Sequence, residues 1–262
     1  MRDFLRAVLC LDGFLHTPDA HSRMKISVQF FSLLFLLLFA SAALAKDKAT
    51  ANLEPWKLED NGSFLNLIPA PPSLESSAEK ADLDGVISLQ NKVSSDALAH
   101  AEKSVDFNVF SFSEVLGPDF TKESHQKTAN FFDRLEVTID QPKNFLKDFY
   151  HRIRPYRAFP DQVKELVIKE DGYSYPSGHA TRAWLYALVL GTLAPDHRSD
   201  FLSTAMQVCQ DRVIGGMHYP SDVLESRILA EEIFRELLDD KSFMSDLEKL
   251  RREEWIEKNS AK

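Results

Sequence analysis

Apolar residues recur three and four positions apart along most of the chain from Ser73 onward, where Gly and Pro are sparse. This spacing places apolar side chains on one face of a helix, and it is clear in residues 83–98 and 131–139. Further helices are predicted at about 143–153, 178–194, 197–214, 221–238 and 240–258, separated by Pro195-Asp196, Gly215-Gly216 and Asp239-Asp240. No segment shows the alternation of a half-buried strand. We therefore expect an all-α fold, in which residues 73–262 form a single-domain helical bundle.

The first part of the chain has the pattern of a targeting segment. A run dominated by Leu and Phe at residues 26–40 precedes the small-residue stretch 41–45, which is the order found in a secretory signal peptide. The run is short for a bilayer span, so cleavage before Lys46 is favoured over an uncleaved anchor. The acidic residues in front of Met24 are untypical of a signal peptide and favour Met24 as the true start of translation. We expect residues 1–45 to be removed and the protein to be exported, either to the periplasm or by full secretion.

The segment 46–72 differs from the helical part that follows it. It is rich in Lys, Asp, Asn and Pro and ends in Pro69-Ala70-Pro71-Pro72, which cannot continue a helix, so an extended arm on the surface is predicted. In the remaining chain the longest apolar stretch, residues 183–193, is too short to cross a membrane and is interrupted by Gly191. It is therefore expected to be the central core helix, and the mature form is expected to have no integral membrane span.

Charge and cysteine content narrow the classes of function. The 262 residues include 31 Lys and Arg against 40 Asp and Glu, a formal charge of −9. This balance disfavours nucleic-acid binding, which needs a basic face. Of the two cysteines, Cys10 lies in the leader, so Cys209 is left alone and no intramolecular disulfide is expected in the mature chain. Cys209 lies in an apolar-patterned stretch and is expected to be buried and inert.

Two cations stand shortly before a proline. Lys147 and Arg154 are seven positions apart, which is two helical turns, so both would project from one side of a helix that begins near Lys143 and ends before Pro155. Two cations that face one way attract an anion, although this spacing on its own is more often a solvated face.

The sequence Pro176-Ser177-Gly178-His179 leads directly into the apolar helix. Free N–H groups at a helix start, with Gly178 allowing close approach and Ser177 offering a hydroxyl, form an anion site that suits phosphate. The alternative is that Ser177 only caps the helix and His179 is a surface residue.

A third group consists of Arg212, His218 and Asp222. Arg212 falls in the last turn of a helix that Gly215-Gly216 ends, and Pro220 starts the next helix, so His218 and Asp222 can meet. A carboxylate bonded to one imidazole nitrogen fixes the tautomer and leaves the other nitrogen as base, nucleophile or metal ligand. A metal site would normally show more His and carboxylate ligands at close spacing, and the cations on the same elements would repel a metal ion, so we expect no metal. No other cofactor is expected either.

Together, Lys147-x6-Arg154-Pro155, Pro176-Ser177-Gly178-His179 and Arg212-x5-His218-x3-Asp222 resemble a known motif in order and spacing. It is the three-part motif of the type 2 phosphatidic acid phosphatase superfamily, which includes the vanadium-dependent haloperoxidases. Within this superfamily the chain looks most like the bacterial class A non-specific acid phosphatases, over roughly residues 64–250. The resemblance implies a helical bundle of the acid phosphatase/vanadium-dependent haloperoxidase type and a metal-independent phosphoric monoester hydrolase.

The resemblance also implies a role for each motif residue. His218 would attack phosphorus to form a phosphohistidine, Asp222 would orient and charge-stabilise its imidazole, and His179 would protonate the leaving oxygen and later activate water. The phosphoryl oxygens would be held by Lys147, Arg154, Ser177, Gly178 and Arg212. Substrates would be small phosphate monoesters, and vanadate would inhibit. Because His218 must be neutral while His179 is protonated, we expect a rate optimum between about pH 5 and 7.

Two features depart from the family pattern. Asp211 stands where the motif usually has Ser, and its carboxylate could pair with Arg212 or Lys147 and compete with phosphate, or it could face away. The class A enzymes also carry a cysteine in the turn at Gly215-Gly216 that pairs with one in the loop before Pro-Ser-Gly-His, and residues 156–175 contain none.

Other functions stay open at this point. A haloperoxidase would bind vanadate with the same residues, but such enzymes are usually much longer. The chain could instead act on a lipid phosphate presented at a surface, or be an exported binding protein whose site has decayed through Asp211. The acidic C-terminal helix, with Leu247 and Leu250, could pack on the body or on a second subunit, so a homo-oligomer also stays open.

Overall fold

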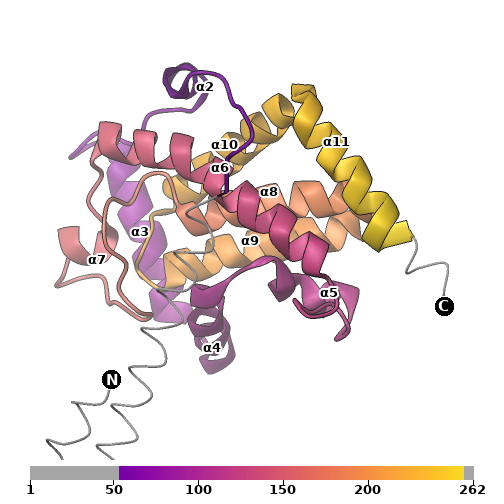
Figure 1. Ribbon diagram of the computed structural model, residues 1–262. Coiled ribbons are helices and arrows are strands. Elements are labelled where there is room, and N and C mark those ends of the chain that lie inside the picture. Colours follow the sequence, from indigo (N-terminus) through magenta and orange to yellow (C-terminus); the bar gives the residue numbers. More distant parts are fainter. Residues whose placement is uncertain (1–52, 257–262) are drawn as a thin grey trace, which may run out of the picture. The chain divides into compact units, whose positions relative to one another are not determined.

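The computed structural model describes residues 53–256, and every regular element in that range is helical, which confirms the predicted all-α fold (Figure 1). The signal peptide predicted over residues 1–45 lies outside the described residues. The α-helices are α2 (Phe64–Leu67), α3 (Ser77–Lys92), α4 (Ser95–Lys103), α5 (Ser113–Leu116), α6 (Gln126–Tyr150), α7 (Pro155–Ala158), α8 (Gly178–Leu193), α9 (Arg198–Ile214), α10 (Pro220–Asp239) and α11 (Lys241–Leu250). The shorter 3-10 turns are η1 (Asn61–Ser63), η2 (Ser104–Asp106), η3 (Val109–Phe112) and η4 (Pro195–His197), and a π-helical segment, η5 (Arg251–Ile256), follows α11.

Helix α8 is the buried centre of this arrangement, in contact with α6, α9 and α10 (Figure 1). Twelve of its 16 residues are buried, most of them apolar, as predicted for the central core helix. The Ser177 side chain accepts the N–H of Ala180 at 3.3 Å, so the start of the helix is fixed at the Pro-Ser-Gly-His sequence. The first turn of the most buried helix therefore carries Gly178 and His179.

The helix predicted to begin near Lys143 is the second half of a much longer one. α6 already begins at Gln126 and contains Pro142. Proline lacks an N–H and usually ends or kinks a helix, so the sequence predicts two pieces where the structure has one. α6 ends at Tyr150, and His151 follows with a left-handed φ of 50°. Arg154 lies beyond this end, so the prediction that it shares a helix face with Lys147 is wrong.

The extended arm predicted over residues 46–72 also needs a correction. Within it, η1 and α2 are helical, and the side chains of Trp56, Phe64 and Ile68 are buried. Isolated apolar residues between polar ones carry no periodic pattern, which is why the sequence predicts a surface segment here. The arm is packed into the core at these three points.

Trp56 joins the arm to two helices. Its ring packs on Phe131 of α6 and Phe243 of α11, at centroid distances of 4.8 and 5.1 Å. Its indole N–H donates to the Asp246 carboxylate of α11 at 3.2 Å. The beginning of the described chain is thereby fixed to its end.

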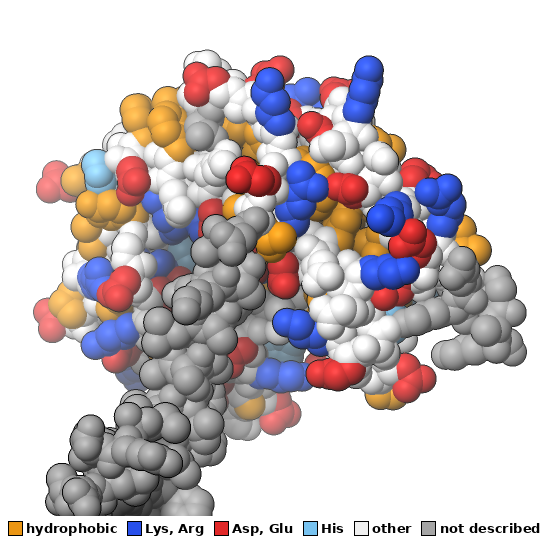
Figure 2. All heavy atoms as spheres, viewed as in Figure 1, with side chains coloured by type: hydrophobic (Ala, Val, Ile, Leu, Met, Phe, Trp, Pro, Cys, Tyr) orange, Lys and Arg blue, Asp and Glu red, His pale blue; other side chains and the backbone are white. Residues whose placement is uncertain are grey.

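Helix α11 packs within the same chain, burying Phe243, Leu247 and Leu250. On the face shown in Figure 2, Lys and Arg side chains are interspersed with Asp and Glu side chains. Within residues 53–256 no helix is long and apolar enough to cross a bilayer.

Candidate active site

Two of the three motif segments line a cavity of about 620 Å³. Lys147 comes from the last turn of α6, and Arg154 is the residue before α7. Gly178 and His179 come from the first turn of α8. Lys147 and Arg154 thus approach each other because the chain turns sharply after α6, and not because they share a helix.

The third segment lies behind this cavity. Arg212, His218 and Asp222 have side chains with 0% exposure. The carboxylate of Glu170, which lines the cavity, lies next to Arg212 and His218. The structure therefore brings the three predicted segments into one site. The charged side chains of the third segment are buried beneath the cavity.

A glycine turn between α9 and α10 positions His218. Gly216 has a φ of 76°, and a Cβ there would lie 2.4 Å from the carbonyl oxygen of Lys164, so only glycine fits. The Leu166 N–H donates to the Gly215 carbonyl at 3.1 Å. The loop that lacks the class A cysteine pair is thus hydrogen-bonded to the turn that carries His218.

The imidazole of His218 is held between an anion and a cation. Its Nδ1 is 3.5 Å from the Asp222 carboxylate, and its Nε2 is 3.0 Å from Nη1 of Arg154. The same Asp222 oxygen accepts the Tyr219 N–H at 2.9 Å and the hydroxyl of Ser174. Burial, and next the Arg154 charge, lower the pKa of His218, so its neutral form is favoured. A neutral ring with Nδ1 as the donor toward a carboxylate keeps its lone pair on Nε2, the position a nucleophile needs, and in this structure that lone pair accepts from Arg154.

Sequence reasoning missed the residues that fix Asp222. Arg152 donates to Asp222 Oδ1 at 2.6 Å and to Asp82 of α3 at 2.7 Å, and its guanidinium lies 4.0 Å from the centre of the Tyr219 ring. Burial would raise the pKa of Asp222, but the bonds from His218 and the Arg152 charge outweigh it and lower this pKa to about 2. No local pattern points to Arg152 or to Asp82, which lies 70 residues away.

Lys147 and Arg154 differ in their hydrogen bonds and ion pairs. The Arg154 guanidinium donates to the carbonyl oxygens of Gly172 and Met217 at 3.2 and 3.1 Å, and its Nη1 lies 3.0 Å from the Glu170 carboxylate. The Lys147 ammonium donates to the Tyr173 carbonyl. Burial, and next the charge of Arg154, lower the pKa of Lys147 to about 7. Lys147 therefore gains or loses its charge near neutral pH.

Arg212 is the least satisfied polar group of the site. Its Nη2 donates to Glu170, whereas its Nε and Nη1 are buried and have no hydrogen-bond partner within the described residues. Burial lowers the pKa of Arg212, and the Glu170 charge opposes this. A fully buried guanidinium normally has most of its donors paired, so the unpaired donors indicate room for an anion with more oxygens than one carboxylate.

His179 is oriented by a backbone carbonyl. Its Nε2 lies 3.0 Å from the Val105 carbonyl oxygen in η2, and because a carbonyl oxygen can only accept, Nε2 is the donor in this contact. Its Nδ1 faces the Glu170 carboxylate at 3.2 Å. Burial lowers the pKa of His179, with Glu170 acting in the opposite direction. No sequence pattern could reveal Val105, because the contact uses a backbone atom.

Ser177 stabilises the start of α8 and its contact with α10. Its side chain is buried and caps α8, and its N–H donates to the Ser226 hydroxyl of α10 at 2.8 Å. Gly178 lies beside the Lys143 side chain, where a Cβ would be 3.1 Å from Lys143 Cδ. The phosphate contacts assigned to Ser177 and Gly178 stay predictions.

Glu170 was not singled out from the sequence, where it is one residue of a Glu-Asp-Gly loop. Its carboxylate contacts His179, Arg212, Arg154 and, at 3.7 Å, Nε2 of His218. Burial would raise the pKa of Glu170, but bonds with His179 and His218 outweigh it and hold this pKa far below the usual range. Glu170 is therefore an anion at the centre of the predicted phosphate site.

Asp211 does not contact the cations predicted to bind phosphate. Its buried carboxylate lies 2.8 Å from Nδ1 of His100 and accepts a hydrogen bond of 3.0 Å from Gln207. Of the alternatives left open by the sequence, the structure shows the one in which the Asp211 carboxylate faces away from Arg212 and Lys147.

Burial raises the pKa of the Cys209 thiol to about 12, consistent with an inert thiol.

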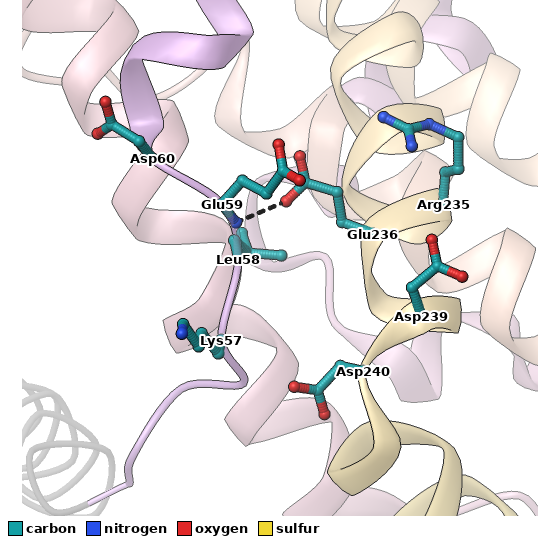
Figure 3. Close-up of a pocket in the computed structure, with 8 residues that line it drawn as sticks. All are labelled: Lys57, Leu58, Glu59, Asp60, Arg235, Glu236, Asp239 and Asp240. Carbon is teal, nitrogen blue, oxygen red and sulfur yellow. Dashed lines mark hydrogen bonds between the residues drawn. The ribbon is translucent and has the colours of Figure 1, made fainter.

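A second cavity, of about 580 Å³, lies between the arm and the end of α10 (Figure 3). The Glu59 N–H donates to the Glu236 carboxylate across it at 2.9 Å. Five carboxylates and two cations line it, namely Glu59, Asp60, Glu236, Asp239, Asp240, Lys57 and Arg235. This balance disfavours an anionic ligand.

Between residues 53 and 256 the structure contains no group of three or more His, Cys, Asp or Glu side chains that could hold a metal ion.

Comparisons with known proteins identify related sequences. The model of a family described as the PAP2 superfamily matches residues 136–235, which include all the motif residues and Glu170. A non-specific acid phosphatase of Salmonella typhi is 28% identical over 236 residues, covering 86% of this chain and 94% of that protein. A non-specific acid phosphatase of Providencia stuartii is 29% identical over 204 residues, covering 72% and 79%. The crystal structure of a bacterial vanadium-dependent iodoperoxidase matches with 17% identity and a TM-score of 0.49, covering 72% of this chain and 57% of that one. The resemblance predicted from the motif is confirmed at the level of the superfamily.

Proposed function

Because residues 136–235 form a domain of the PAP2 superfamily, we propose that this chain is an exported acid phosphatase that hydrolyses phosphate monoesters at the cavity described above. The observation that carries the proposal is the pair of buried nitrogens of Arg212 that are unpaired within the described residues. It is a fully buried guanidinium with two nitrogens that have no partner in the described part of the chain, and it lies next to the cluster formed by Arg154, His179 and His218. Phosphoryl oxygens would pair with these donors, and charge-assisted bonds of this kind are strong in a buried site.

The proposed reaction has two steps. Nε2 of His218 attacks phosphorus, the N–P bond forms, and the P–O bond to the alcohol breaks while Nδ1 of His179 gives its proton to the leaving oxygen. A water molecule then attacks the phosphohistidine, His179 takes the proton of this water, and phosphate leaves with His218 restored. Asp222 stabilises the positive charge on the His218 ring, a role that suits its 3.5 Å distance from Nδ1.

The cations supply what phosphoryl transfer needs most, namely positioning and neutralisation of the equatorial oxygens. Lys147, Arg154 and Arg212 are proposed to bind these oxygens together with the Gly178 N–H and the Ser177 hydroxyl. With this donor set no metal ion is required in the proposed mechanism.

The proposal is tested by the hydrolysis of p-nitrophenyl phosphate between about pH 4 and 9 in the presence of EDTA. We expect EDTA-resistant activity with an acidic optimum, inhibited by vanadate, and a loss of at least about a thousandfold in His218→Ala. His197→Ala is the matched control, because this histidine of η4 is half-exposed and remote from the motif segments. Activity that needs an added metal, that survives in His218→Ala, or that still rises above about pH 8 would contradict the mechanism.

Export is a separate part of the proposal and has its own test. It is supported by the apolar run at residues 26–40 and the small residues that follow. The intact mass and N-terminal sequence of the protein recovered outside the cytoplasm should begin at Lys46. A protein that retains the preceding residues would contradict cleavage.

A further inference from the structure

The phosphoryl site of this protein is already filled by one of its own side chains. We propose that Glu170 determines the phosphate affinity of the site: its carboxylate occupies the phosphoryl position in the free enzyme and must leave before a phosphate monoester or inorganic phosphate binds. This inference rests on the proposed function, because it concerns the same site.

The contacts of Glu170 are those expected of a bound phosphate. One oxygen bonds Arg212 and lies 3.2 Å from Nδ1 of His179. The other is 3.0 Å from Arg154 and 3.7 Å from Nε2 of His218. The two arginines that would bind a phosphate monoester, and the two histidines that would attack and protonate it, therefore converge on one carboxylate.

Glu170 and a phosphoryl group cannot occupy the site together. Nucleophilic attack requires phosphorus about 3–3.5 Å from the attacking nitrogen. The 3.7 Å between Nε2 of His218 and the Glu170 oxygen leaves no room for a phosphorus atom with its own oxygens. The side chains of His218 and Arg212 have 0% exposure while Glu170 is in this position.

A carboxylate fills the site only in part. Glu170 offers two oxygens, and two nitrogens of Arg212 find no partner in the described region. A phosphate offers more oxygens and a larger charge, so it can replace Glu170 and also engage the unpaired donors. The exchange still breaks the ion pairs of Glu170, so the observed affinity for phosphate is lower than the cations alone would give.

The surrounding loop allows the side chain to leave. It is anchored on one side by the bond from Leu166 to Gly215 and on the other by the Ser174 N–H, which donates to the Arg152 carbonyl at 2.7 Å. Between these anchors Gly172 has a φ of 75°, and the Glu170 side chain is 21% exposed. Rotation of the side chain toward the cavity therefore does not require the anchors to open.

The direct test is the equilibrium binding of inorganic phosphate to Glu170→Gln by titration calorimetry. Glutamine keeps the size of the side chain and removes its charge, so we expect the Kd for phosphate to fall by roughly tenfold. Glu165→Gln is the matched control, because Glu165 lies on the same loop and pairs with Lys169. It should bind phosphate like the unchanged protein. In hydrolysis assays KM and the inhibition constant of phosphate should fall in parallel in Glu170→Gln.

An unchanged or higher Kd in a folded Glu170→Gln protein overturns the proposal, because Glu170 would then organise the cations instead of competing for them. If this variant does not fold, a crystal structure of the unchanged protein with vanadate decides. The proposal requires the Glu170 carboxylate to have left Arg154 and Arg212, and a structure with both anions on these guanidinium groups overturns it. Because binding is measured directly, a protein that binds phosphate without hydrolysing it would contradict only the proposed function.

Discussion

Two charged regions meet at His218, and they are built in opposite ways. On one side the buried triad of Asp82, Arg152 and Asp222 places one cation between two anions, with bonds of 2.6 and 2.7 Å. On the other side lies the cavity cluster of Lys147, Arg154, Arg212, His179 and Glu170. There, Arg154 and Arg212 share the carboxylate of Glu170, and two nitrogens of Arg212 lack a partner in the part of the chain that the structure describes.

The difference separates positioning from binding. A buried network in which each charge is matched holds its members in one arrangement, and here it fixes the carboxylate that faces Nδ1 of His218. An excess of buried cations is unfavourable in the free protein and becomes favourable when an anion arrives. In the proposed function, the buried triad therefore orients the imidazole and the cavity cluster binds the ligand.

The sharpest way to break this comparison is to remove one arginine from each region. Arg152→Met should lower the free energy of unfolding by about 3–5 kcal/mol, because it leaves two carboxylates buried without their cation. Arg212→Met should change the free energy of unfolding by about 1 kcal/mol or less, because Glu170 keeps its contacts with Arg154 and His179. It should nevertheless lower kcat/KM by about 10²–10³-fold. Urea denaturation and steady-state kinetics measure the two effects.

If both variants lose stability to a similar extent, the cavity cluster is as structural as the buried triad, and the comparison fails. Methionine is chosen at both positions because it fills much of the volume of arginine without charge, so that cavities do not dominate the result.

A smaller effect is expected from the titration of Lys147. Its pKa of about 7 means that the ammonium form is present below pH 7 and is lost as the pH rises. Above pH 7 phosphate binding must add a proton to Lys147, so the affinity should fall by up to about tenfold per pH unit. In Lys147→Arg the cation stays charged, and this part of the pH dependence should vanish. Calorimetric Kd values for phosphate between about pH 6 and 9 provide the measurement.

The ionisation of phosphate itself affects the unchanged protein and Lys147→Arg equally, so it cancels in the ratio of their Kd values. A ratio that stays constant with pH would mean that Lys147 remains charged throughout.

The smallest effect on activity is expected at Asp211, which belongs to neither region. Asp211→Ser should change kcat/KM by less than about threefold, because the carboxylate bonds to His100 and Gln207 and not to the cations. The free energy of unfolding should fall by about 1–3 kcal/mol, because these two partners lose a buried acceptor. Steady-state kinetics and urea denaturation of this single variant are sufficient. A rise in kcat/KM of tenfold or more would place Asp211 in the cavity cluster after all.

The sequence is a good guide to which segments meet in the candidate site. The three motif segments come together as expected, and the pattern of threes and fours correctly predicts a helical fold. It is a poor guide where contacts join distant segments. Asp82 reaches Arg152 across 70 residues, and the Val105 carbonyl contacts His179 across 74. Such contacts depend on the packing of helices and leave no local pattern.

Glu170 and Pro142 show two further limits. Glu170 stands in a polar loop, where a carboxylate is ordinarily solvated, and only the fold brings it between the arginines. Pro142 is a reliable helix breaker in isolation, yet tertiary packing keeps α6 continuous through it. In both cases the surrounding structure outweighs a local preference that is correct on average.

The anchoring of Trp56 has a consequence for the order in which the chain is completed. Trp56 is among the first residues of the described chain to leave the ribosome, and Asp246, which accepts its indole N–H, is made 190 residues later. Its ring partner Phe243 is also synthesised near the end. Contacts of such large sequence separation form late, because the long loop between them must be closed first. The segment around Trp56 is therefore synthesised early and takes up its native contacts late.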